Sequence, residues 1–117
     1  MPELFIIKQN DLRPHLYAVL GRIDEDSGEV PEGEGDVITG ATVVFSMRDE
    51  NGTVKVDKEP VVVDDDEEGM VHYIWQEGDT DTAGTFYGEF QVTLAGEPIT
   101  YPNDKVGFKI KITEEIA

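Results

Sequence analysis

The chain has 117 residues, a length that suits one domain with a single hydrophobic core. Its 26 acidic and 9 basic residues give a formal net charge of -17 at pH 7, so the surface repels nucleic acids and anionic membranes, and we expect neither as a partner. No cysteine is present, which excludes disulfides, thiolate catalysis and cysteine-ligated zinc.

The N-terminal segment MPELFIIKQN lacks the basic region and the long apolar run of a signal peptide. No apolar stretch of the sequence approaches the roughly 20 residues that a membrane-spanning helix needs. We therefore expect a protein that is made in the cytoplasm without a signal peptide.

The dominant hydrophobic period along the chain is two, which is typical of β-strands that pack one face on a core. The alternation is clearest where Phe86, Phe90 and Val92 share one face, and no segment shows a helical stripe with caps. In chain order, the expected strands are 3–9, 16–22, 42–49, 53–57, 60–64, 70–77, 86–94 and 105–113.

Turn residues separate these strands. Between the third and fourth strands, Asn51-Gly52 predicts a hairpin because this dipeptide accepts positive φ. Short strands at intervals of about 8–12 residues indicate a sandwich or a barrel. We predict an all-β fold, an immunoglobulin-like antiparallel β-sandwich of about 7–9 strands that forms one domain over residues 1–117.

Two acidic segments interrupt the strand pattern. Residues 24–36 contain seven acids and three glycines without any period, which predicts a long acidic loop, either simply solvated or ordered by a partner. The solvated loop is the favoured interpretation. The run VDDDEEG at 63–69 predicts a turn whose charges keep a sheet edge from pairing with other chains.

The segment EGDTDTAGTFYGEF, residues 77–90, begins like a calcium loop, with Asp79 and Asp81 in D-x-D spacing and a glycine at 84. Phe90 occupies the position of the bidentate glutamate, so an EF-hand is excluded. Asp79 and Asp81 remain candidates for a calcium site of another type. The favoured interpretation is a turn in which both carboxylates accept hydrogen bonds from backbone N–H groups.

Catalytic chemistry has little support in the sequence. The two histidines, His15 and His72, have no nucleophile motif beside them, and we predict that the protein is not an enzyme and needs no cofactor. Trp75 is expected in the core, with an assembly contact as the alternative, because the segment 70–77 is apolar on both faces.

Four segments resemble, in order, one known family: IIKQNDLRPHLYAVL, ITGATVVFSMRDENGTV, EEGMVHYIWQEGDTDTAGTFYGEFQVT and GEPITYPNDKVGFKIKI. Together they are similar to the N-terminal domain of the baseplate upper protein family of tailed bacteriophages. The resemblance implies an immunoglobulin-like domain that docks a larger appendage onto the phage tail or baseplate.

From the resemblance we expect a non-enzymatic virion structural or docking module of the tail or baseplate. Its partners would be other virion proteins, and it would form a homo-oligomer in the assembled particle. The alternatives are a head or neck decoration protein and a calcium- or carbohydrate-binding β-sandwich. Candidate interface residues are Tyr17, Tyr87 and Tyr101.

Overall fold

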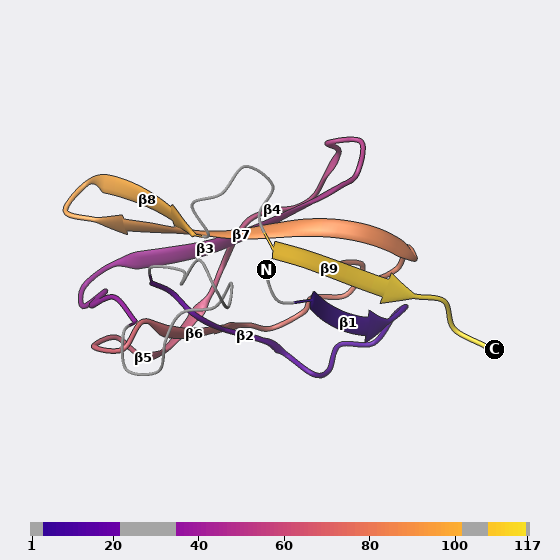
Figure 1. The fold of residues 1–117 in the computed structure, drawn as a ribbon, viewed down its shortest axis with the longest axis horizontal. Coiled ribbons are helices and arrows are strands. Elements are labelled where there is room, and N and C mark those ends of the chain that lie inside the picture. The colour runs from indigo at the N-terminus through magenta and orange to yellow at the C-terminus, as the bar shows by residue number, and fades with distance from the viewer. Residues whose placement is uncertain (1–3, 22–34, 102–107, 117) are drawn as a thin grey trace.

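The computed structural model describes residues 4–21, 35–101 and 108–116, and over these ranges the chain forms nine strands in two layers (Figure 1). The described part contains no helix that could cross a membrane. The strands are β1 (Leu4–Lys8), β2 (Leu16–Val19), β3 (Thr42–Asp49), β4 (Val54–Pro60), β5 (Val62–Asp65), β6 (Met70–Tyr73), β7 (Gly84–Leu94), β8 (Glu97–Tyr101) and β9 (Phe108–Thr113).

The larger sheet has the order β1-β9-β7-β3-β4, with β8 also paired to β7, and the smaller sheet has the order β2-β6-β5. β1 runs parallel to β9, whereas the other pairs of described strands are antiparallel. In an immunoglobulin domain, strands B, E and D correspond to β2, β6 and β5, and strands G, F, C and C′ correspond to β9, β7, β3 and β4. The predicted immunoglobulin-like β-sandwich is confirmed.

Most strand bounds lie within two residues of the prediction, but β2 ends at Val19 rather than at 22, β4 extends to Pro60 rather than to 57, and β6 is also shorter than predicted. β6 ends at Tyr73 rather than at 77, because the chain turns where Asp79 N–H donates to the Gln76 carbonyl at 3.0 Å. β8 is an additional strand that the hydrophobic period does not predict, and it contains Pro98, which is tolerated because the strand lies at an edge of the sheet. The β7–β8 hairpin turns at Ala95, whose φ is 52°, and at Gly96.

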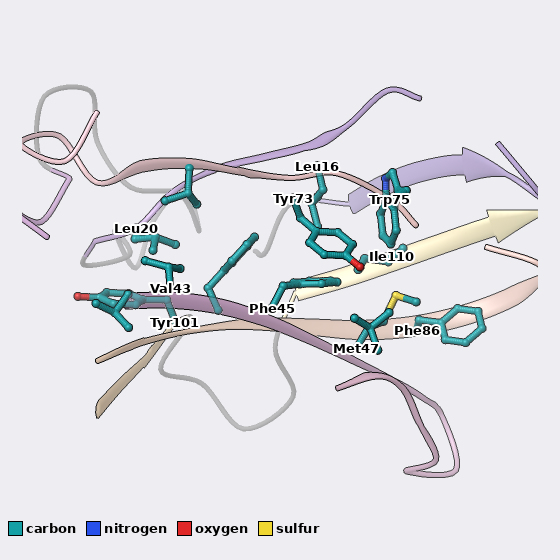
Figure 2. Close-up of a cluster of buried hydrophobic side chains, with 14 of the residues drawn as sticks. Leu16, Leu20, Val43, Phe45, Met47, Tyr73, Trp75, Phe86, Tyr101 and Ile110 are labelled. Atoms are coloured by element: carbon teal, nitrogen blue, oxygen red, sulfur yellow. The ribbon is translucent and has the colours of Figure 1, made fainter. Parts of the chain in front are cut away.

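The core fills the space between the two sheets with the inward side of each strand, as the period of two predicts. Figure 2 shows Tyr73 of β6 and Trp75, which follows that strand, facing Phe45 of the larger sheet, and the Phe45 ring centroid lies 4.6 Å from that of Tyr73. Trp75 is only 2 % exposed, so its expected core position is confirmed and an assembly contact is excluded in this conformation. The other face of this segment, with Met70 and Ile74, is exposed.

The described residues on either side of the segment 22–34 lie beside each other, and of the predicted acidic loop 24–36 only Gly35 and Asp36 are among the described residues. Gly21 and Gly35 pair as an isolated bridge, and the Asp36 N–H donates to the Leu20 carbonyl at 2.7 Å. A Cβ atom at Gly35 would lie 1.7 Å from the Glu68 carbonyl oxygen. Only glycine therefore fits this close approach of two backbone segments.

Candidate functional site

The corner between β6 and β7 is fastened by Asp79. One carboxylate oxygen, Oδ2, accepts a hydrogen bond from the Tyr73 hydroxyl at 2.6 Å and another from the Gln76 backbone N–H at 2.9 Å. Burial of the ring, and then the hydrogen bond to Asp79, raise the pKa of Tyr73 well above its ordinary value. The predicted backbone hydrogen bond to Asp79 is thus present, and this carboxylate is committed to holding the fold.

Asp81 is held differently. Its Oδ1 pairs with Lys55 Nζ of β4 at 2.5 Å and accepts the Thr82 hydroxyl at 2.9 Å, and these hydrogen bonds lower the pKa of the Asp81 carboxyl. The lysine is the main partner of this side chain, and a backbone hydrogen bond from Asp81 itself contributes less to the lowered pKa. Among the described residues, no group of three or more His, Cys, Asp or Glu side chains could hold a metal ion, so Asp79 and Asp81 are not joined by further ligands there.

Thr80, between these two aspartates, links the corner to the chain that follows β1. The side chain is buried, and its hydroxyl donates to the Asp11 carbonyl at 2.9 Å. The Thr80 carbonyl in turn accepts the Asn10 N–H at 2.9 Å. The aspartate-rich corner is therefore a structural junction between the segment that follows β1 and the segment that leads into β7.

The three tyrosines proposed as interface residues do not form one patch. Tyr17 is 64 % exposed on the outer face of the smaller sheet, whereas Tyr87 is half-buried on the outer face of the larger sheet. Tyr101 points into the core, because its pairing with Phe90 in the β7–β8 ladder places both residues on the inward side, and its hydroxyl donates to Asp36 at 2.5 Å. The expectation that Tyr101 is a surface contact is wrong in this conformation.

The outer side of the smaller sheet, here called the acidic-edged face, carries a row of exposed large apolar side chains: Tyr17, Val19, Val62, Met70 and Ile74. His72 lies at the centre of this face, with its ring 4.9 Å from that of Tyr17 and 5.6 Å from that of His15, to which it is nearly parallel. Its Nδ1 lies 2.8 Å from Asp64 Oδ2. Contiguous exposed apolar side chains of this kind are typical of a protein-binding surface.

Acidic side chains edge this face along β5 and the turn that follows. β5 ends at Asp65, whose Oδ1 accepts the backbone N–H groups of Glu67 and Glu68 at 3.1 and 3.3 Å. The predicted turn in the run 63–69 is therefore confirmed. Asp64, Asp65 and Glu67 remain exposed, so a partner can approach these carboxylates even though Asp64 also contacts His72 and Asp65 also holds the turn.

The outer side of β1, β9, β7 and β3, here called the basic face, has the opposite charge. Its outward-pointing charged residues are Lys8, Arg48, Lys109, Lys111 and Glu89. Strand register aligns Leu4, Lys109, Tyr87 and Arg48 in one row across the four strands. The Arg48 guanidinium lies 5.2 Å from the centre of the Tyr87 ring, within cation–π range. Leu4 and Ile6 add exposed apolar side chains at the edge.

Sequence reasoning identified Tyr17 and Tyr87 but not the surfaces to which they belong. Comparison with models of known protein families finds no match, and comparison with curated proteins finds no similar sequence. The two outer faces, with their exposed apolar and charged side chains, are the structural basis of the function proposed below.

Proposed function

We propose that this chain is a non-enzymatic structural module of a tailed-phage virion, located in the tail or baseplate, that acts by docking to other virion proteins. The resemblance of four ordered segments to the baseplate upper protein family supports the placement in a phage particle. The observation that carries a docking role is the pair of outer faces, each with exposed apolar side chains beside charges that are mostly of one sign.

The internal polar groups support a structural role for the buried hydroxyls. In the part of the chain that the structure describes, every buried polar side-chain atom has a hydrogen-bond partner. Tyr73, Thr80 and Tyr101 use their hydroxyls to fasten one segment of the fold to another. Their polar groups are thus engaged in holding the sandwich together, which leaves binding by the outer faces as the activity that this geometry supports best.

The test is to find the protein in the virus. Purified particles from the source of this chain are incubated with a gold-labelled antibody against it and examined by electron microscopy. Label at one end of the tail is the expected result. Label over the head or neck would support the decoration protein instead, and unlabelled particles with free protein in infected cells would overturn the virion role.

A further inference from the structure

We propose that the basic face of one copy binds the acidic-edged face of a second copy, so that the chain assembles head to tail. This inference deepens the proposed function and rests on it, because it names a second copy of this chain as a partner of the docking module. Three observations carry it: the charges on the two faces, their apolar side chains and their positions on the sandwich.

The basic face is an exception on a strongly acidic molecule. The chain has 9 basic residues, and four of them, Lys8, Arg48, Lys109 and Lys111, point outward from this one face. Glu89 is the acid among the outward-facing positions of its four strands. A partner that complements this face must present carboxylates.

The acidic-edged face of another copy supplies those carboxylates. Asp64, Asp65 and Glu67 are exposed along its edge, within reach of a partner's lysines. His72 contacts Asp64 but leaves the other two carboxylates without a basic side chain among the interactions of the described residues. The two faces of the same molecule are therefore opposite in charge.

The apolar side chains match as well. Leu4 and Ile6 on the basic face are 50 % and 55 % exposed, and Tyr17 and Met70 on the acidic-edged face are 64 % and 43 % exposed. The Arg48–Tyr87 stack adds the residue types that are enriched in protein interfaces. Contact between the two faces would remove both sets of apolar side chains from water while pairing their charges.

The positions of the faces determine the kind of assembly. They lie on the outer sides of the two sheets, so they point away from each other in one copy (Figure 1). A contact between different faces is heterologous, and its repetition gives a ring or a filament rather than a two-fold dimer. Such an assembly suits a structural module of a particle.

The association is tested by sedimentation velocity of the full chain between about 10 µM and about 1 mM at an ionic strength of about 0.15 M, where charges farther apart than roughly 8 Å are screened. The expected result is a sedimentation coefficient that rises with concentration. A chain that stays monomeric over the whole range would overturn the inference. Gold label on the virion would then still support the proposed function, so the two failures are distinguishable.

Charge reversal tests which faces meet. One variant carries Lys109→Glu and Lys111→Glu on the basic face, and the other carries Asp64→Lys and Glu67→Lys on the acidic-edged face. Each double variant on its own is expected to associate at least about tenfold more weakly than the unmodified chain, because like charges then face each other across the contact. An equimolar mixture is expected to regain it, since every contact between alternating copies again pairs opposite charges.

The matched control reverses two exposed basic residues outside the four strands of the basic face and the three strands of the acidic-edged face. Arg13→Glu, between β1 and β2, with Lys58→Glu on β4 changes the net charge as much as the basic-face variant does. This control should keep association within about threefold of the unmodified chain, because the contacting charges are retained. Equal weakening by the control, or a mixture that stays monomeric while both variants melt cooperatively, would show that the two faces do not meet.

Discussion

The Tyr73 hydroxyl donates a hydrogen bond to the Asp79 carboxylate 2.6 Å away, and this bond ties the end of β6 to the turn that leads toward β7. An immunoglobulin domain fastens the same region with a tyrosine near the start of strand F. Here Phe86 is the first buried side chain of β7, and the hydroxyl comes from β6 instead. The motif that begins like a calcium loop is therefore an anchor of the sandwich.

Removing this hydroxyl should destabilise the protein. Tyr73→Phe is expected to lower the free energy of unfolding by about 1–3 kcal/mol, because a buried hydrogen bond to a charged group is lost. Asp79→Ala should cost at least as much, since it leaves a buried hydroxyl and the Gln76 N–H without their acceptor. Urea unfolding followed by Trp75 fluorescence measures both changes.

Tyr87→Phe is the control for this pair, because the Tyr87 ring lies on an outer face. We expect it to change the unfolding free energy by less than about 0.5 kcal/mol. Tyr73→Phe with a loss no larger than that of the control would contradict an anchoring role for the hydroxyl.

The close packing around Gly88 predicts that a larger residue at this position destabilises the fold. A Cβ atom there would lie 2.8 Å from Phe45 Cε1, 2.9 Å from Phe108 Cζ and 3.0 Å from Ile110 Cδ1. Gly88→Ala should therefore destabilise the fold by about 1–3 kcal/mol through overpacking. Thermal unfolding by circular dichroism gives the measurement.

A double-mutant cycle identifies the cause of this cost. Phe108→Leu removes one of the atoms that the new methyl group would meet, so Gly88→Ala should cost less in that background. Additive effects of the two substitutions would rule out a clash with the Phe108 ring.

Alkaline pH should weaken the fold through Tyr101. Burial of the ring, followed by the hydrogen bond to Asp36, raises the pKa of Tyr101 to about 12. This folded-state pKa exceeds the ordinary value of 10.0, so the folded state favours the protonated Tyr101 hydroxyl. The stabilisation of the fold by this hydroxyl is therefore fully present below pH 10 and is lost as the pH rises from 10 towards 12. The free energy of unfolding should therefore fall over that window.

The comparison that isolates this effect is Tyr101→Phe. The variant should have a lower free energy of unfolding than the unmodified chain at about pH 8. This difference should shrink above about pH 10, where deprotonation of Tyr101 removes the stabilisation that its hydroxyl provides. Urea unfolding at a series of pH values measures the gap. A gap that stays constant or widens up to about pH 12 would be inconsistent with the raised pKa.

Calcium should leave the protein unaffected. Asp79 Oδ2 already accepts two hydrogen bonds, and Asp81 Oδ1 pairs with the positive charge of Lys55. Among the described residues, no third His, Cys, Asp or Glu side chain joins them to complete a metal site. Addition of about 5 mM calcium is expected to shift the melting temperature by less than about 1 °C relative to a chelator control. A rise of several degrees that disappears in Asp79→Asn would revive the calcium-binding alternative.

The sequence by itself determined the class of the fold and the inward side of most strands. The period of two in residues 42–49 and 86–94 placed Phe45, Phe90 and Val92 in the core, where the structure has them. It also predicted the hairpin at Asn51-Gly52, which the β3–β4 pairing confirms. These features could be predicted because alternation and turn preference are properties of adjacent residues.

Only the tertiary structure decided which distant residues meet. The strand order brings β1 beside β9 and β3 beside β7, and this order gathers Lys8, Lys109 and Arg48 on one face. The pairing of β2 with β6 likewise sets Tyr17 against His72. A strand pattern specifies which face of the strand is apolar but not which strand lies beside it, because many partners can satisfy the same backbone hydrogen bonds. The charges of the two faces are therefore visible only once the sheets have formed.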